Sequence, residues 1–339
     1  MKVSIIGYST CCLNHTGGVQ VRIKKIYELL NLRSDVEVEY FCPMKTDFES
    51  IDVLHLFKLN FEYFNLVRKA KAKGIKIVLS SIVPLSGGSR IDLYRRFINK
   101  FPLMTIYKMV FDILSHVDAL IVETQEELDF IVKHYGVDVS KIVVIPNGVE
   151  VYSYDGNEIF DKIRGLKDYV LHVGRIDSNK NQFNLIKALK GTGIDVLLIG
   201  GEDTNSLSYV EKCKELAKGD NHFHFLGWID SNSNLLKSAY ANAKVFAFPS
   251  YQETFGLALL EAAVAGCNIA MSDTLPIHGF HVFDDSFIFS PSNFEDIRAK
   301  ILSAFYFPKN DIIKQRVIDT FSWDKIIESH VALYESLCK

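Results

Sequence analysis

Phe248-Pro-Ser-Tyr-Gln-Glu253-Thr-Phe-Gly-Leu-Ala-Leu-Leu-Glu261-Ala-Ala-Val-Ala-Gly266 is the stretch that indicates the fold most directly. An apolar strand ends at Pro249, a polar loop follows, and we expect a helix to begin near Phe255 or Gly256. Gly266 supplies a glycine cap at the end of this helix. A buried strand that passes through a short loop into a helix is the repeating unit of a parallel α/β sheet.

The same stretch contains two glutamates that need an explanation. Glu261 is the only charged residue between Leu257 and Ala265, so no solvated face is evident. Burying a carboxylate without a partner is costly, and we therefore expect Glu261 to face a ligand or to pair with a base. The alternatives are a helix-forming glutamate at an exposed position for Glu261 and a carboxylate favoured by the helix dipole for Glu253.

Short β-branched runs recur along the rest of the chain with amphipathic stretches between them, in two similar halves. This pattern predicts an α/β fold with two Rossmann-like, doubly wound parallel-sheet domains that face a central cleft, residues 1–155 and 156–319. A helix over about 320–339 is expected to pack back on the first domain. The predicted strands are Val3–Ile6, Val36–Phe41, Val53–Phe57, Ile75–Leu79, Ala119–Val122, Ile142–Ile145, Tyr169–Val173, Val196–Ile199, His222–Leu226, Val245–Phe248, Asn268–Met271 and Phe287–Phe289.

The composition of the 339 residues excludes several classes of protein. Hydrophobic residues at 48% and charged residues at 23% are ordinary globular values, and the net charge of −3 implies no general attraction to nucleic acid. The six cysteines lack CxxC spacing, which disfavours a metal site or a disulfide framework and indicates reduced, cytosolic thiols. The first apolar run is too short for a signal peptide and is expected to be a strand. No run approaches the ~20 apolar residues of a membrane span.

Two loops carry groups suited to a phosphate. Gly17 and Gly18 precede the helix expected over Val19–Leu30, where backbone N–H groups can approach an anion; a flexible loop is the alternative. Arg175 and Lys180 lie on the loop that follows the strand ending at Val173. A forked guanidinium and a mobile ammonium together suit a diphosphate, whereas the alternative is a pair of solvated surface charges.

These motifs together resemble the retaining glycosyltransferases of the GT-B fold, in particular glycosyltransferase family 4. The resemblance spans residues 17–323, with the motifs in family order at family-like spacings. It rests on Glu253-x7-Glu261 behind Pro249-Ser250, on Arg175 and Lys180, on Val144-Ile-Pro-Asn147-Gly148-Val149-Glu150 and on Phe225-Leu-Gly227-Trp-Ile.

The resemblance implies a role for each matching position. Arg175 and Lys180 would hold the donor diphosphate, Glu253 would accept hydrogen bonds from the donor sugar, and Glu261 would bind the ribose hydroxyls. Thr254 and the backbone N–H groups of Phe255, Gly256 and Leu257 would face sugar or phosphate. The nucleobase would lie against Gly227, Trp228 and Ile229, and Gly17 and Gly18 would close over the diphosphate from the other domain.

The acceptor side departs from the family pattern. The family often has a histidine after the fourth strand, where this chain reads Val78-Leu-Ser-Ser81. His55, after the third strand, resembles another common family histidine; a histidine satisfied within the fold is the alternative. His55, Ser81 and Asn147 are therefore candidate contacts to the acceptor or the sugar.

The resemblance implies transfer of a glycosyl group from a nucleotide sugar, with retention at the anomeric carbon. Asp-x-Asp is absent from the sequence, so we expect no metal and no cofactor; cations would replace the metal, and a UDP-sugar is favoured over a GDP-sugar as co-substrate. A sugar-nucleotide 2-epimerase of the same fold and a non-catalytic, sugar-nucleotide-binding partner subunit are the alternatives. The sequence leaves the donor sugar, the acceptor, its linkage and the oligomeric state open.

A basic and aromatic segment predicts where the acceptor is presented. Residues 58–108 contain eleven Lys and Arg against two acids, a charge of +9 that leaves −12 for the rest of the chain. Interleaved aromatics suit an anionic membrane surface, whereas packing of these aromatics in the domain core is the alternative. No nucleic-acid-binding motif accompanies the charge. We therefore expect a cytoplasmic protein, peripheral on the inner face of the plasma membrane, that extends a lipid-linked bacterial surface glycan.

Overall fold

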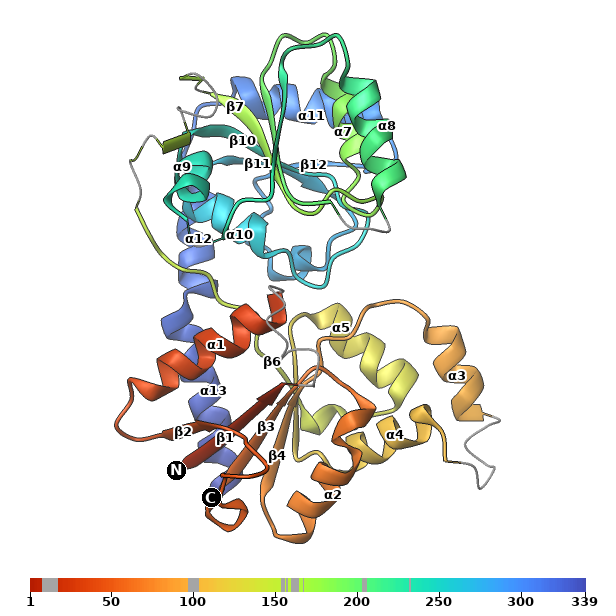
Figure 1. Cartoon of the computed structure of the whole chain (residues 1–339), viewed down its shortest axis with the longest axis vertical. Helices are drawn as coiled ribbons and strands as arrows, with labels where there is room; N and C mark the ends of the chain where they lie inside the picture. Colours follow the sequence, from red (N-terminus) through yellow and green to blue (C-terminus); the bar gives the residue numbers. More distant parts are fainter. Residues whose placement is uncertain are drawn as a thin grey trace. The chain divides into compact units, whose positions relative to one another are not determined.

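A computed structural model describes residues 1–7, 18–96, 104–153, 156, 158–159, 165–166, 168–202, 206–231 and 233–339. The chain forms two compact units, one of residues 1–148 with 323–339 and one of residues 149–322 (Figure 1). Within the described ranges, no helix combines the length and the apolar character that crossing a membrane requires.

Unit 1 is a parallel sheet of six strands in the order β2-β1-β3-β4-β5-β6. The inner strands, such as Val53–Phe57 and Ala119–Val122, are nearly continuous buried runs, as expected where helices cover both faces of a sheet, whereas the edge strand Glu37–Tyr40 is partly exposed. The strands are β1 (Lys2–Gly7), β2 (Glu37–Tyr40), β3 (Val53–Phe57), β4 (Lys76–Ser80), β5 (Ala119–Val122) and β6 (Ile142–Val144), and the helices are α1 (Gly18–Asn31), α2 (Phe64–Ala72), α3 (Gly88–Arg96), α4 (Ile106–His116), α5 (Gln125–Phe130) and α13 (Trp323–Cys338).

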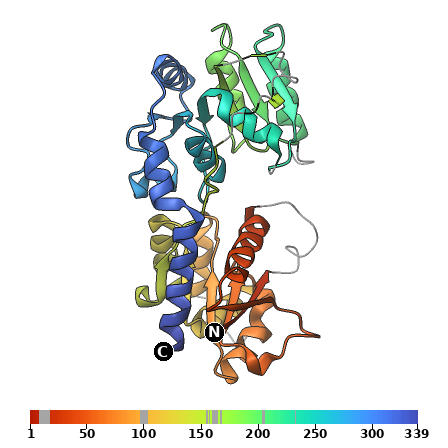
Figure 2. The same cartoon turned by 90° about the vertical axis from the view of Figure 1, so that its left-hand side faces the viewer.

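The two faces of this sheet have separate cores. α1 and α13 cover one face, and α2 and α4 cover the other. α13 comes from the far end of the sequence, and Figure 2 shows it beside the strands of unit 1, where Cys338 Sγ lies 3.9 Å from Met1 Sδ. Its apolar stripe, which includes Trp323, Ile327 and Val331, is buried on the sheet as the amphipathic pattern predicts.

Unit 2 is a second six-stranded parallel sheet, in the order β12-β11-β10-β7-β8-β9. Helices α9, α10 and α12 pack on one face and α7, α8 and α11 on the other. The strands are β7 (Tyr169–Val173), β8 (Val196–Ile199), β9 (Phe223–Gly227), β10 (Ala243–Phe248), β11 (Asn268–Ser272) and β12 (Phe287–Phe289), and the helices are α7 (Gln182–Leu189), α8 (Leu207–Ala217), α9 (Asn234–Asn242), α10 (Leu257–Val264), α11 (Phe294–Tyr306) and α12 (Ile312–Phe321).

The strand order of unit 2 determines where a ligand can bind. The chain proceeds from β7 outward through β8 and β9, and then returns to the other side of β7 to start β10. Helices that follow β7 and β10 lie on opposite faces, so the loops after these two strands diverge at the carboxyl edge of the sheet. Ligands of doubly wound folds bind in this crevice.

The structure confirms the α/β fold with two doubly wound sheets, and every predicted strand is present. The chain passes between the units at Gly148–Val149 and at Ser322–Trp323, instead of near residues 155 and 320. The two crossings are fixed side by side, because Val149 N donates to Phe321 O at 2.8 Å and a Cβ on Gly148 would lie 2.3 Å from the Trp323 indole.

A buried polar layer lies between α13 and the sheet of unit 1. His55 Nδ1 is 2.7 Å from Tyr334 Oη, and His55 Nε2 is 2.9 Å from Ser80 Oγ. His330 Nδ1 donates to Ile326 O at 2.8 Å. Burial, together with nearby Arg22, lowers the pKa of His330 to about 3, and burial lowers the pKa of His55 well below its usual value. Both histidines are therefore neutral in the folded protein at pH 7.

This layer predicts a loss of stability in acid. In the unfolded chain these histidines bind protons below about pH 6.5, whereas in the folded protein they stay neutral. Each of the two histidines therefore lowers the free energy of unfolding by about 1.4 kcal/mol for every pH unit that the pH falls below 6.5. We expect His330→Phe to reduce the difference in stability between pH 7 and pH 5. Urea unfolding in a Trp228→Phe background, where Trp323 is the remaining tryptophan, measures this. An unchanged difference in His330→Phe would contradict a buried neutral histidine.

Candidate functional site

The loops after β7 and β10 are joined by one asparagine at the crevice that the topology indicates. Asn179 Nδ2 donates to Gln252 O at 2.8 Å, and Gln252 N donates to Asn179 Oδ1 at 3.1 Å. Tyr251 N also donates to Asn179 O at 2.8 Å. Asp177 caps the first loop by accepting from the backbone N–H groups of Asn179 and Lys180. The two loops are thus held in a fixed register.

Lys180 and Glu253 form an ion pair across these loops. The distance from Lys180 Nζ to Glu253 Oε1 is 2.5 Å, and the two side chains are 18% and 12% exposed. The Lys180 ammonium also lies 5.5 Å from the centre of the Phe248 ring. An ion pair that is mostly shielded from water but still accessible can exchange partners with a charged, hydroxylated ligand. The structure therefore brings together two of the predicted residues.

Arg175 lies on the same loop, and its side chain is exposed. Its guanidinium is 3.7 Å from the carboxylate of Asp177, and the side chain is 68% exposed. A guanidinium held at the loop surface can turn toward an anion without leaving a buried charge unpaired. The structure places Arg175 beside Lys180 on the loop, as the motif predicts.

The segment after Glu253 leads into α10. Thr254 is exposed, whereas the side chain of Phe255 is buried and packs edge-on against Phe321 at 5.5 Å between ring centres. Gly256 has φ 101°, where a Cβ would also lie 3.2 Å from Phe248, so glycine is needed at this turn. The helix starts at Leu257, slightly later than predicted, and its first turn presents N–H groups that lack helical acceptors.

Glu261 is partly buried on α10, next to a tyrosine. Tyr240 Oη donates to Glu261 Oε2 at 2.8 Å. Burial raises the pKa of Glu261 to about 7, although the Tyr240 hydroxyl opposes this shift. The expected basic partner is absent among the described contacts of Glu261; a phenol takes its place. A partly accessible carboxyl with this pKa can accept hydrogen bonds from ligand hydroxyls once it is ionised.

The predicted nucleobase segment also lies at the carboxyl edge of this sheet. Gly227 ends β9 with φ 70°, and its carbonyl accepts from Gly200 N at 2.8 Å. Trp228 is 62% exposed, and a Cβ on Gly201 would lie 3.4 Å from it. A Cβ on Gly200 would lie 1.8 Å from Gly174 O, so the ends of β7 and β8 approach closely. An exposed indole on such a platform suits stacking of a base.

The predicted residues of unit 1 are mostly enclosed by protein. Both ring nitrogens of His55 are hydrogen-bonded within the fold, which matches the alternative of a satisfied histidine. Ser81 is fully buried, and its hydroxyl donates to Glu127 Oε1 at 2.7 Å. Asn147 is 5% exposed and accepts from Gly148 N at 2.9 Å. Gly18 is exposed at the start of α1, and Gly17 lies outside the described residues.

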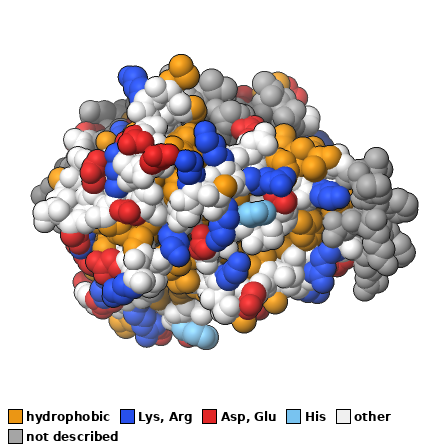
Figure 3. Space-filling view, turned by 90° about the horizontal axis from the view of Figure 1, so that it is seen from below, with side chains coloured by type: hydrophobic (Ala, Val, Ile, Leu, Met, Phe, Trp, Pro, Cys, Tyr) orange, Lys and Arg blue, Asp and Glu red, His pale blue; other side chains and the backbone are white. Residues whose placement is uncertain are grey.

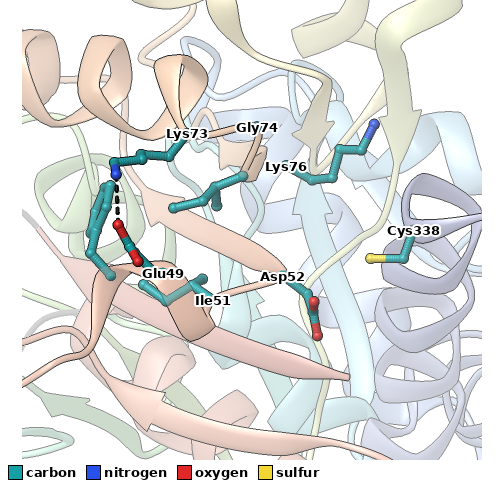
Figure 4. Close-up of a pocket in the computed structure, with 9 residues that line it drawn as sticks. Glu49, Ile51, Asp52, Lys73, Gly74, Lys76 and Cys338 are labelled. Carbon is teal, nitrogen blue, oxygen red and sulfur yellow. Dashed lines mark hydrogen bonds and ion pairs between the residues drawn. The ribbon is translucent and has the colours of Figure 1, made fainter.

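A groove in unit 1 does not belong to this site. It has a volume of about 330 Å³ and is lined by Glu49, Asp52, Lys73, Lys76 and Cys338, among others (Figure 4). It lies at the amino ends of β3 and β4, where the Lys73 ammonium is 2.6 Å from the Glu49 carboxylate. The carboxyl ends of parallel strands are the usual ligand edge, so the loops of unit 2 remain the better candidate.

Comparisons with known proteins agree with this geometry. Residues 157–310 match the family model for glycosyl transferases group 1, and residues 45–152 match the model for glycosyltransferase family 4. The chain belongs to the family 4, group 1 glycosyltransferases. The GT-B resemblance stated from the motifs is thereby confirmed.

Individual relatives match only in part. D-inositol 3-phosphate glycosyltransferase of Rhodococcus opacus is 27% identical over 167 residues, which are 45% of this chain and 37% of the relative. Phosphatidyl-myo-inositol mannosyltransferase of Mycolicibacterium smegmatis is 33% identical over 141 residues, 40% of this chain and 35% of the relative. The matched part of the chain thus spans little more than a third of either relative.

A solved structure matches along the whole chain. The structure of Anabaena HepE in complex with UDP has a TM-score of 0.75 at 15% identity and covers 99% of this chain and 100% of HepE. At this identity, the likeness shows the shared fold.

The pKa of Glu261 predicts how nucleotide binding depends on pH. If ribose hydroxyls bind the ionised carboxyl, affinity should rise up to about tenfold per pH unit below pH 7 and level off above it. Calorimetry with UDP and GDP from pH 5.5 to 8.5 measures this. Glu261→Gln is the control, because the diphosphate of the ligand titrates in the same way whichever protein binds it. Parallel curves for the two proteins would contradict the role of Glu261.

Proposed function

We propose that this glycosyltransferase moves a sugar from a nucleotide-diphosphate sugar to a hydroxyl of a glycan acceptor, with retention at the anomeric carbon and without a metal. The observation that carries the proposal is the Lys180–Glu253 ion pair, which is fixed by the loops after β7 and β10. Gly227 ends β9 of the same sheet, Trp228 follows it directly, and Glu261 lies on α10, the helix after β10. The rest of a nucleotide would extend toward these residues.

The two residues of the ion pair contact different parts of the donor, Lys180 the diphosphate and Glu253 the sugar. An ammonium has three N–H donors, so Lys180 can keep Glu253 and still donate to the diphosphate. Glu253 retains lone pairs that accept from the sugar hydroxyls. Arg175 and the N–H groups at the start of α10 add positive charge around the phosphates. A UDP-sugar is the favoured donor, which the UDP complex of HepE supports.

The chemical step needs charge stabilisation at the leaving group. The bond between the anomeric carbon and the diphosphate oxygen breaks with its electron pair on the diphosphate, and the sugar passes through an oxocarbenium-like state. The acceptor oxygen bonds to the same face, and its proton goes to the departing phosphate oxygen. Lys180 and Arg175 stabilise the negative charge that develops, which is the role a metal would otherwise have.

The acceptor is proposed to be a lipid-linked precursor of a bacterial surface polysaccharide, used at the cytoplasmic face of the membrane. The relative from Mycolicibacterium smegmatis is, by name, a mannosyltransferase of a phosphatidyl lipid, which supports a lipid-linked acceptor. Figure 3 shows basic, acidic and hydrophobic side chains interspersed on one face of the molecule. On α3 and near the start of α4, Leu93, Met104 and Ile106 are 56–58% exposed.

Some of the bases and aromatics in the basic segment, residues 58–108, are engaged within the protein and are not available to a membrane. Lys71 pairs with Asp118 at 2.7 Å and Lys73 with Glu49 at 2.6 Å, and both acids lie outside the segment. Tyr63 and Tyr94 are 2% exposed and belong to the interior, as the alternative holds. Phe97, Lys100 and Phe101 lie outside the described residues. We therefore propose α3 with the start of α4, where apolar side chains are exposed, as the membrane surface in preference to α2.

Removing either cation should slow turnover far more than it changes the fold. Lys180→Met and Arg175→Ala each remove a charge from the leaving group, and losses of about 2 to 4 kcal/mol, or roughly 30- to 1000-fold in kcat, are typical of such donors. Release of UDP or GDP from radiolabelled donors measures this, with circular dichroism as the control for folding. Turnover near that of the wild type, or loss of activity with a chelator, would contradict the assignment.

Scrambling of the configuration at sugar C2 in the absence of acceptor would instead indicate an epimerase.

Vesicle co-sedimentation tests the membrane surface. Binding should require anionic lipid, fall with salt, and weaken in Arg90→Gln/Lys108→Gln, since each base near an anionic leaflet contributes ~1 kcal/mol. Lys71→Gln/Lys73→Gln removes the same charge from the C-terminal end of α2 and the residue that caps it, and should bind like the wild type. Equal weakening of the two variants, or equal binding to neutral vesicles, would favour a soluble acceptor.

A further inference from the structure

Two buried polar side chains lie beneath the loop that carries Arg175 and Lys180. His172, on β7, is 1% exposed, and Gln182, the first residue of α7, is fully buried. His172 Nδ1 lies 2.9 Å from Ala247 O, and its Nε2 lies 3.0 Å from Gln182 Nε2. Gln182 Nε2 also donates to Arg175 O at 2.7 Å. A chain of hydrogen bonds thus links the centre of the sheet to the loop backbone.

The chemistry of the partners fixes the direction of each hydrogen bond. A carbonyl oxygen only accepts, so the proton of the neutral imidazole is on Nδ1 and Nε2 is an acceptor. The two hydrogens of the Gln182 amide then go to His172 Nε2 and to Arg175 O. If the amide nitrogen and oxygen of Gln182 exchanged places, the oxygen would face two acceptors, His172 Nε2 and Arg175 O, and both hydrogen bonds would be lost. Burial lowers the pKa of His172 to about 4, which keeps the ring neutral.

The peptide at Arg175 is held from two sides. Gly174 N donates to Ile199 O at 2.9 Å and Ile176 N donates to Gly201 O at 3.1 Å, both toward β8. The carbonyl of Arg175 is held instead by Gln182. Without Gln182, the Arg175 carbonyl loses this hydrogen bond and the buried Nε2 of His172 loses its donor, so the peptide is no longer held in this orientation.

We propose that Gln182, supported by His172, is a positioning residue that sets the direction in which the Arg175 side chain leaves the loop toward the donor diphosphate. This inference rests on the proposed function. Because Gln182 acts through the Arg175 backbone, its effect is confined to ligands with a diphosphate and disappears when the guanidinium is absent. A residue that only fills the core would instead lower stability in every background.

A double-mutant cycle distinguishes these roles. Calorimetry with UDP and GDP compares wild type, Gln182→Leu, Arg175→Ala and the double variant, and ligand-observed NMR follows uridine and guanosine. Gln182→Leu should weaken diphosphate binding about tenfold or more, because small misplacements of a binding group are costly. Nucleoside binding should stay unchanged, and Gln182→Leu should have no further effect in Arg175→Ala. Asn184→Leu, on the same helix but bonded to Pro291 and Tyr251, is the matched control and should bind like the wild type.

Several results would overturn the inference. They are unchanged diphosphate affinity in Gln182→Leu, an equal loss in the Arg175→Ala background, or an equal loss of nucleoside affinity. If Gln182→Leu does not fold, His172→Leu/Gln182→Leu, which replaces both polar partners with apolar groups, is measured in the same way. Failure of the wild type to bind either nucleotide would overturn the proposed function itself, and the inference with it.

Discussion

Lys180 and Glu253 are 73 residues apart in the sequence, and their ion pair depends on two parallel strands that end side by side. β7 and β10 are neighbours in the sheet although β8 and β9 lie between them in the chain. The loops after these strands therefore meet at one edge, and Asn179 fixes their register with hydrogen bonds to the opposite loop. The shielded pair, the Arg175 loop and the start of α10 all follow from this juxtaposition.

Much of this arrangement could be predicted from local sequence. The strands of a doubly wound sheet are buried on both faces, so short β-branched runs such as Val196–Ile199 are recognisable without a partner. The strand, loop and helix around Glu253 and Glu261 follow from the positions of Pro249 and Gly266 and from the absence of other charges. Helix α13 was recognisable from its amphipathic stripe, which requires a surface to cover it.

The residues that sequence reasoning missed act through contacts that no local pattern encodes. Asn179, Tyr240 and Gln182 are ordinary polar residues in the sequence, and their partners lie far along the chain or on the backbone. Conversely, the motif made His55 and Ser81 candidates for a substrate contact, but the fold buries both with protein partners. Local patterns report which residues end a strand; they do not report which side chains the tertiary structure encloses.

The most direct test of the account is the crystal structure of the protein with UDP bound. The account predicts diphosphate oxygens within hydrogen-bond distance of Lys180 Nζ and the Arg175 guanidinium, and ribose hydroxyls on the Glu261 carboxylate. Glu253 should remain within reach of Lys180. A diphosphate bound elsewhere, for example at Lys73 and Lys76 in the groove of unit 1, would contradict the assignment of the loops after β7 and β10 as the donor site.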